Sequence, residues 1–128
     1  MVSGVGWGET MITSIAFTVY SVSDMAAARR FYEGVLKLSC SSNFRDEWIE
    51  YDLGESTFAI TTIDMGHTPG APGGVVAFEV TDLDAFVQGL KQSGVPFVVE
   101  PMETGVCRMA VIQDPDRNHL TIHKRHAG

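Results

Sequence analysis

The segment DPDRNHLTIH, residues 114–123, contains two histidines and a threonine at a spacing that can put them on one surface. Its first half favours a turn, and its second half alternates polar and apolar side chains as a half-buried strand does. Because side chains alternate across a strand, His119, Thr121 and His123 share one face. A histidine titrates at about pH 6.5 and can therefore hydrogen-bond a ligand or transfer a proton near neutrality.

Three further side chains have the chemistry to contact a small molecule. Glu79 lies in a strand-like stretch, residues 75–80, and offers a carboxylate, although a lone glutamate is often exposed or half of a salt bridge. Phe17 and Trp48 offer flat apolar rings, although an aromatic side chain in a strand is often core. For His123 the alternative is a solvated histidine near a chain end. Whether each of these residues contacts a ligand or has one of these other roles depends on the elements that carry it.

The first half of the chain has the pattern of a strand, a helix and three strands. Polar and apolar residues alternate over 12–22, Asp24 lies where a helix N-cap belongs, and apolar residues then recur at helical spacing from Met25 to Leu36. The next three expected strands are 38–42, 48–53 and 57–63.

The same order repeats after a linker rich in Gly and Pro at residues 64–74. A strand is expected over 75–80, Asp82 begins a helix that runs to about residue 92, and Gly94 begins a turn back. The last three expected strands are 97–102, 107–113 and 119–123. Each half is therefore βαβββ, which predicts an α+β fold.

Two such halves define the expected domain organisation. A half of roughly 60 residues cannot bury both faces of a four-stranded sheet, so we expect the halves to curl around a shared cleft, within one chain or between chains. The expected boundaries are a flexible arm at 1–11, a single domain at 12–124 with modules 12–63 and 75–124 joined by linker 64–74, and a tail at 125–128.

The composition excludes several classes of function. With 128 residues, of which 45% are hydrophobic, the chain can fold as one domain without metals or disulfides. Its net charge of -7, with no Lys/Arg cluster, argues against nucleic-acid and membrane partners but permits cationic ligands. Cys40 and Cys107 form no CxxC motif, and no signal peptide or long apolar run is present, which predicts free thiols and a cytoplasmic location.

Three segments in order carry a family resemblance: VSDMAAARRFYEGVLKL at 22–38, AFEVTDLDAF at 77–86 and DPDRNHLTI at 114–122. From Ile12 to Lys124 the chain resembles the vicinal oxygen chelate superfamily of glyoxalases, extradiol dioxygenases, fosfomycin-resistance enzymes and bleomycin-resistance proteins. The resemblance implies the glyoxalase/bleomycin-resistance fold, in which two βαβββ modules with curved mixed sheets form a cleft. It does not fix a function, because this fold carries lyases, oxygenases, transferases and drug-binding proteins.

In metal-using members of that family, four positions supply the ligands. The resemblance places them at Phe17 (or Ser14 if two residues are inserted), Ile60 or Thr61, Val75 and Thr121. A catalytic divalent ion needs about three His, carboxylate or thiolate donors, so we expect no metal here. A displaced site that uses His123, Glu79 and Glu50 is the alternative.

We therefore expect a metal-independent member of this family that uses no cofactor and binds a small, neutral or cationic, partly aromatic molecule. The cleft would be shared by the two chains of a homodimer, as in bleomycin-resistance proteins, because paired modules leave apolar edges that need cover. Phe17 and Trp48 would form its walls, and Glu79, Thr121 and His123 would orient the ligand. Two alternatives stay open: a metal-dependent lyase or dioxygenase with displaced ligands, and an interaction module with a vacant cleft.

Overall fold

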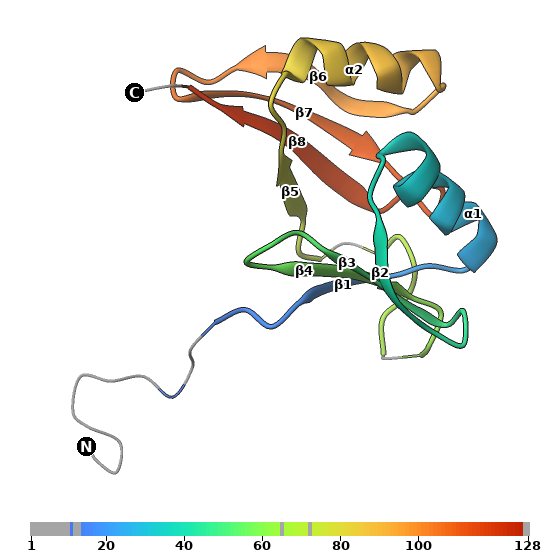
Figure 1. The fold of residues 1–128 in the computed structure, drawn as a ribbon. Coiled ribbons are helices and arrows are strands. Elements are labelled where there is room, and N and C mark those ends of the chain that lie inside the picture. Colours follow the sequence, from blue (N-terminus) through green and yellow to red (C-terminus); the bar gives the residue numbers. More distant parts are fainter. Residues whose placement is uncertain (1–10, 12–13, 65, 72, 127–128) are drawn as a thin grey trace.

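The computed structural model describes residues 11, 14–64, 66–71 and 73–126, which form two βαβββ modules (Figure 1). The first comprises β1 (Thr18–Ser21), α1 (Met25–Arg29), the π-helix η1 (Arg30–Val35), β2 (Cys40–Phe44), β3 (Trp48–Asp52) and β4 (Thr57–Thr61). The second comprises β5 (Val76–Glu79), α2 (Leu83–Gln92), β6 (Phe97–Glu103), β7 (Cys107–Gln113) and β8 (His119–Arg125). The expected α+β class and the βαβββ repeat are confirmed.

Local sequence signals set most element boundaries. Asp24 and Asp82 cap α1 and α2, and in each case the carboxylate accepts a hydrogen bond from a backbone N–H three residues on, at 3.1 Å. The observed β1 is shorter than the strand predicted over residues 12–22. Residues 14–17 are exposed and have no regular structure. Residues 1–10, 12–13 and 127–128, which include most of the expected arm and part of the tail, lie outside the described residues.

The first helix differs from the expected continuous α-helix. After Arg29 it widens into η1, where the backbone N–H of Leu36 donates to the carbonyl of Phe31, five residues back, at 2.9 Å. Within η1 the adjacent aromatic side chains Phe31 and Tyr32 are both buried. The α-helical spacing predicted for this stretch therefore ends within the element.

The two sheets have the same topology. Their strand orders are β1-β4-β3-β2 and β5-β8-β7-β6, and in each sheet the first pair is parallel and the others antiparallel. β1 therefore lies at one edge of the first sheet, and β5 lies at one edge of the second. Since residues paired across neighbouring strands point to the same side, this register assigns every strand residue to one of two faces.

One face of each sheet is buried in a core that both modules share. Phe58 of β4 meets Phe78 of β5 edge to face at 5.2 Å between ring centroids. The helices contribute to the same core, α1 and η1 through Ala28, Phe31 and Tyr32, and α2 through Leu83, Val87 and Leu90. We call the opposite side of each sheet its open face. The two sheets thus meet through their buried faces, and their open faces point away from the shared core.

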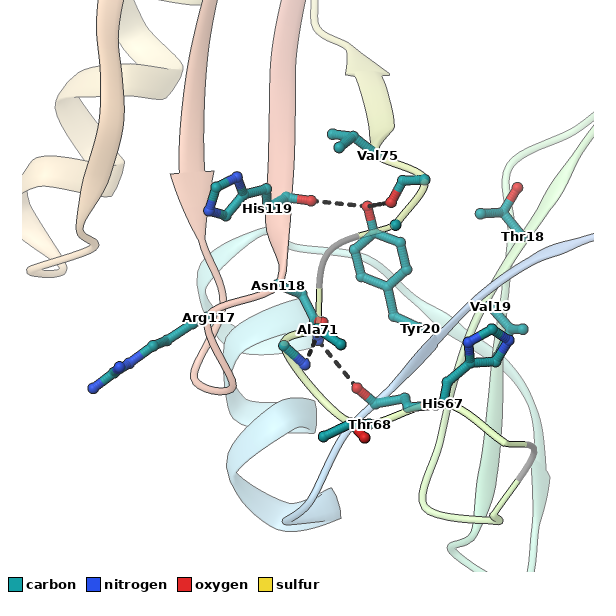
Figure 2. A pocket seen from close by; sticks show the side chains of 14 residues that line it. Thr18, Val19, Tyr20, His67, Thr68, Ala71, Val75, Arg117, Asn118 and His119 are labelled. Atoms are coloured by element: carbon teal, nitrogen blue, oxygen red, sulfur yellow. Dashed lines mark hydrogen bonds between the residues drawn. The ribbon is translucent and has the colours of Figure 1, made fainter.

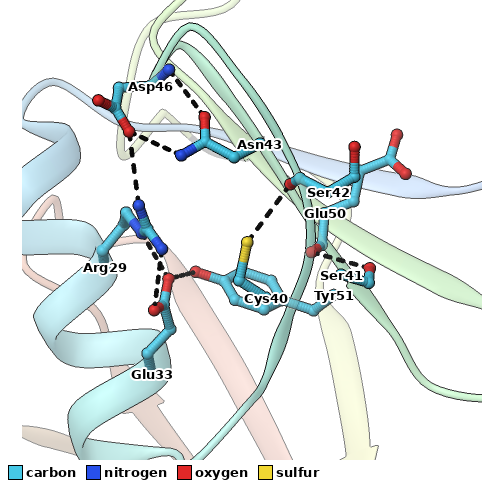
Figure 3. Close-up of polar contacts among 9 residues, drawn as sticks. All are labelled: Arg29, Glu33, Cys40, Ser41, Ser42, Asn43, Asp46, Glu50 and Tyr51. Atoms are coloured by element: carbon cyan, nitrogen blue, oxygen red, sulfur yellow. Dashed lines mark hydrogen bonds and ion pairs between the residues drawn. The ribbon is translucent and has the colours of Figure 1, made fainter.

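Polar bonds fix η1 to the first sheet (Figure 3). Glu33 accepts from Arg29 Nε at 2.6 Å and from the hydroxyl of Tyr51 at 2.9 Å. The bond from Arg29 holds the pKa of Glu33 below its usual value, and burial together with Glu33 raises the pKa of Tyr51 well above its usual range. Tyr51 therefore stays protonated and donates from the sheet to the helix.

A buried carboxylate connects the two modules. Asp114, at the end of β7, is 4% exposed and accepts from the hydroxyl of Tyr32 in η1 at 2.8 Å. It also accepts from the backbone N–H groups of Asp116 and Asn118 and from the Asn118 side chain, at 2.8–2.9 Å. Burial raises the pKa of Asp114, and the hydrogen bonds from Asn118 and Tyr32 oppose that rise.

The turn that Asp114 holds then contacts β1 and the linker. Asn118 Nδ2 donates to the carbonyl of Ser21 at 3.1 Å, and its Oδ1 accepts from the backbone of Gly70 at 2.9 Å. Gly70 has a φ of 78°, and a Cβ there would lie 2.2 Å from the carbonyl oxygen of Asp116, so only glycine fits. The linker is therefore closely packed against the turn at this point.

Tyr32→Phe tests the connection between the modules. The hydroxyl lowers the Asp114 pKa, so its loss costs more when Asp114 is ionised than when it is protonated. We expect the free energy of unfolding to fall by about 1.5–3 kcal/mol near pH 7, and by less near pH 4, close to the ordinary pKa of aspartate. Urea unfolding at both pH values measures this. Tyr51→Phe, which removes a bond to the more exposed Glu33, is the control, and equal losses at both pH values for Tyr32→Phe would contradict the assignment.

Candidate functional site

The open face of the second sheet carries the polar residues predicted from the sequence. On β8, Leu120 and Ile122 are fully buried, whereas Thr121 and His123 are half-buried and His119 is exposed. The predicted alternation along this strand is therefore confirmed.

Glu79 and His123 are brought into direct contact on that face. They are opposite each other in the parallel pairing of β5 with β8, and His123 Nδ1 lies 2.5 Å from Glu79 Oε1. The other carboxylate oxygen accepts from the backbone N–H of Arg125 at 2.8 Å. The bond from Arg125, followed by the one to His123, lowers the pKa of Glu79 below its usual value. Glu79 is thus a carboxylate with both oxygens engaged.

The neighbouring strand positions contribute three apolar side chains to this face. Met109 is paired with His123 across β7 and β8, and Val111 is paired with Thr121. Ala77 of β5 is paired with Thr121 from the other side. On the open face of the second sheet, Glu79, Thr121 and His123 therefore form a polar group that the apolar side chains of Ala77, Met109 and Val111 flank.

The open face of the first sheet carries the aromatic residues. The rings of Phe17 and Trp48 meet edge to face, with 5.3 Å between centroids and 87° between planes. Trp48 Nε1 donates to Glu50 Oε2 at 2.8 Å, which fixes the indole. Phe17 is 43% exposed, and Phe44, paired with Trp48 across β2 and β3, is 52% exposed. This face presents apolar rings with a carboxylate beside them.

The structure brings the predicted site residues together as two groups. Phe17 and Trp48 contact each other on the first sheet, and Glu79 and His123 contact each other on the second, with Thr121 on the same face. Among the described residues no hydrogen bond or ring contact joins the two groups, and the sheets meet through their opposite faces. We call these two groups of predicted site residues half-sites.

None of the positions that supply metal ligands in the resembling family carries a His, carboxylate or thiolate side chain here; they are Phe17 or Ser14, Ile60 or Thr61, Val75 and Thr121. Phe17 and Val75 have no donor atom, and Ile60, one of two candidates on β4, is fully buried in the core. The other candidate, Thr61, uses its hydroxyl to donate to the carbonyl of Glu47 at 2.7 Å. Over residues 14–64, 66–71 and 73–126, no three His, Cys, Asp or Glu side chains cluster closely enough to hold a metal.

The alternative displaced site is only partly assembled. Of its three candidate ligands, Glu79 and His123 are in contact, whereas Glu50 lies on the other sheet and is bonded to Trp48. One chain therefore supplies two neighbouring donors and leaves the third elsewhere.

The sequence did not reveal a cavity of about 460 Å³ between the modules (Figure 2). Residues of β1, the linker and the turn before β8 line it, among them Tyr20, His67 and His119. The hydroxyl of Tyr20 donates to the carbonyl of His119 at 2.8 Å and accepts from the backbone N–H of Val76 at 2.6 Å. Nothing local in the sequence indicates that these three segments converge.

A second cavity of about 490 Å³ lies beside β5. Glu79 contributes to its lining, together with apolar side chains of both modules that include Leu36, Leu53, Phe78 and Phe86. The sequence did not indicate this cavity either, because its walls come from four segments that are far apart in the chain: residues 36–38, 53–56, 77–80 and Phe86. In the part of the chain that the structure describes, no helix has the length and apolar character needed to span a bilayer.

Comparison with known proteins gives a family match and several similar folds. The model of the Glyoxalase/Bleomycin resistance protein/Dioxygenase superfamily matches residues 14–122. TnmS3, an antibiotic binding protein from Streptomyces sp. CB03234, is 20% identical with a TM-score of 0.80, over 92% of this chain and 100% of that one. A superfamily member from Sphaerobacter thermophilus is 20% identical with a TM-score of 0.75, over 91% and 100%. Lactoylglutathione lyase from Agrobacterium tumefaciens is 18% identical with a TM-score of 0.71, over 90% and 96%. No curated protein matches the chain.

Glu79→Gln tests the bonds that engage the Glu79 carboxylate. Because the pKa of Glu79 is lowered in the folded chain, its ionised form stabilises the fold above the ordinary glutamate pKa, and this contribution disappears as pH falls through the folded pKa. We expect the stability difference between the wild-type protein and Glu79→Gln to shrink between about pH 5 and pH 3. Thermal unfolding across that range measures it, with Glu100→Gln as the exposed control. A difference that is constant with pH would show that these bonds do not form.

Proposed function

We propose a binding function from the premise that this chain belongs to the Glyoxalase/Bleomycin resistance protein/Dioxygenase superfamily. The protein binds a small, neutral or cationic, partly aromatic molecule, and it does so without a metal. The observation that carries this proposal is the division of the site residues between two open faces, aromatic on the first sheet and polar on the second. A ligand with a flat apolar part and a polar end complements both.

The complete site forms between two chains of a homodimer. The open faces of one chain point away from its own core, so an aromatic face needs the polar face of a partner to enclose a ligand. Exposed apolar side chains support this arrangement. Phe17 and Phe44 lie on the first open face. Ile15 is 70% exposed and belongs to the segment before β1, which extends away from the sheets (Figure 1). Burying such surface between copies is favourable.

The charge and the rings favour a neutral or cationic ligand over an anion. The net charge of -7 repels anions during encounter, and Glu50 and Glu79 place carboxylates beside the aromatic and polar groups. The faces of aromatic rings attract cations with about 0.5–2 kcal/mol per contact. The net charge and the ring faces therefore both favour a cationic ligand over an anionic one.

The relatives support a binding role by analogy. TnmS3 is described as an antibiotic binding protein, so one protein of this fold binds a small molecule. Lactoylglutathione lyase has the same fold and is an enzyme, which keeps a metal-dependent lyase or dioxygenase as the second candidate. The observation in favour of that candidate is the Glu79–His123 contact, which supplies two of the donors that a metal needs.

A panel of naphthalene derivatives tests the ligand class. We expect 1-naphthylmethylammonium and 2-naphthol to bind more tightly than 2-naphthoate, by about tenfold, because carboxylates line the site and no metal is there to attract an anion. Trp48→Ala should weaken binding of every probe by about 2–30-fold, the equivalent of one ring contact. Isothermal titration calorimetry with chelator present measures all three.

Two variants separate charge from shape in the same titrations. Glu79→Gln should reduce the preference for the cation, whereas Glu100→Gln makes the same charge change on β6 and should not. A preference for 2-naphthoate would contradict the charge argument. Binding that is lost with chelator and restored by a divalent metal would favour the lyase or dioxygenase.

Mixed dimers test whether the site is shared between chains. Trp48→Ala damages one half-site and His123→Ala the other, so each variant alone should bind 2-naphthol weakly. In a heterodimer of the two variants, one cleft combines both damaged halves and the other combines both intact halves. We expect this heterodimer, purified with two different tags, to recover one tight site per dimer.

A site within one chain would give the opposite result. If the site lies within one chain, every chain in the heterodimer is damaged and no tight site returns. Light scattering of the wild-type protein at micromolar concentration should give twice the chain mass, and the mass of one chain would contradict the homodimer.

A further inference from the structure

We infer that Glu79 and His123 act as a fixed hydrogen-bond acceptor that selects ligands carrying a hydrogen-bond donor. This inference rests on the proposed binding function and adds to it the chemical feature that the polar end of the ligand must have. Among flat aromatic molecules of similar size, those with a hydroxyl or N–H group directed at His123 are favoured over those that present only acceptors.

The carboxylate of Glu79 is held in one orientation. Its Oε2 accepts from the backbone N–H of Arg125 at 2.8 Å, and its Oε1 lies 2.5 Å from His123 Nδ1. Glu79 and His123 come from paired strands, so their backbones are also fixed relative to each other. The imidazole ring therefore has a defined position and a defined partner.

This partner decides the tautomer of the ring. An ionised carboxylate can only accept hydrogen bonds, so the nitrogen that faces it, Nδ1, must carry the proton. In a neutral imidazole the other nitrogen, Nε2, then has a lone pair and accepts. Without Glu79 the proton would be free to sit on either nitrogen, and the ring would accept or donate according to the ligand.

The accepting nitrogen is accessible. His123 Nε2 has no hydrogen-bond partner among the described residues, and none of their buried side-chain nitrogens and oxygens lacks one. Nε2 therefore contacts solvent on the open face. The hydroxyl of Thr121 is in the same situation two residues earlier on β8, so a ligand meets an acceptor beside a group that donates or accepts.

A second His–Glu pair in the chain provides a matched comparison. His126 bonds to Glu103 Oε2 through Nε2, at 2.5 Å, so the opposite nitrogen is engaged. This pair lies at the far end of β8, next to the β6–β7 hairpin, and neither residue is among the predicted site residues. It has the same chemistry as Glu79 and His123 without the same neighbours.

Two probes that differ in one donor test the inference. 2-Naphthol carries a hydroxyl, and 2-methoxynaphthalene keeps the oxygen but cannot donate. At about pH 8, where an ordinary histidine is neutral, we expect the wild-type protein to prefer 2-naphthol by about tenfold, as one hydrogen bond to an accessible acceptor gives. Calorimetry of the full-length protein measures both dissociation constants.

Variants then assign the preference to Nε2. The Asn side chain in His123→Asn can still donate to Glu79 from a position close to that of Nδ1, but it has no group where Nε2 was. We expect its preference for 2-naphthol to fall to about twofold or less while 2-methoxynaphthalene binds as before. His126→Asn makes the same change in the comparison pair and should keep the full preference.

The outcomes separate this inference from the proposed function. Equal binding of both probes by the wild-type protein, or an unchanged preference in His123→Asn, would overturn the inference and leave binding in place. Failure of both probes to bind would overturn the proposed function and this inference with it. Nitrogen-15 chemical shifts of the imidazole at about pH 8 give a reading without any ligand: in the wild type the single proton should be on Nδ1, and a single proton on Nε2 would overturn the inference by itself.

Discussion

The arrangement of this molecule depends on one buried carboxylate. Asp114 would be costly to bury alone, and it is tolerated because four donors surround it, one from η1 of the first module and three from its own turn. The side chain of Asn118 is also hydrogen-bonded to the backbone of Ser21 in β1 and of Gly70 in the linker. The turn before β8 is consequently the point where both modules and the linker are joined.

Because the modules are joined in this way, their open faces are separated. The connection brings the helices and the buried faces together, and the Phe58–Phe78 contact continues that shared core between the sheets. The open faces take no part in this core, and they carry the aromatic pair and the polar group. The same packing that stabilises the chain therefore keeps the two groups apart, which is the physical argument for the homodimer that we propose.

Sequence patterns predicted what depends on neighbouring residues and failed where distant ones decide. The N-caps at Asp24 and Asp82 and the alternation along β8 are local, and they were predicted correctly. The turn at Asp114 was predicted, but its bond to Tyr32, 82 residues earlier, was not. The choice between Ile60 and Thr61 needed the strand register, and the widening of the first helix into η1 was not indicated by its apolar spacing.

In the site we propose, two carboxylates would provide specificity that does not depend on a metal. Glu50 is bonded to the indole of Trp48, and Glu79 to the imidazole of His123, so each acid fixes a ring instead of remaining free. An oriented ring presents a defined face or a defined nitrogen, and it loses little conformational freedom when a ligand arrives. In the proposed site these oriented rings would therefore position a ligand, at a place where Thr121 and Val75 supply no His, carboxylate or thiolate ligand to an ion.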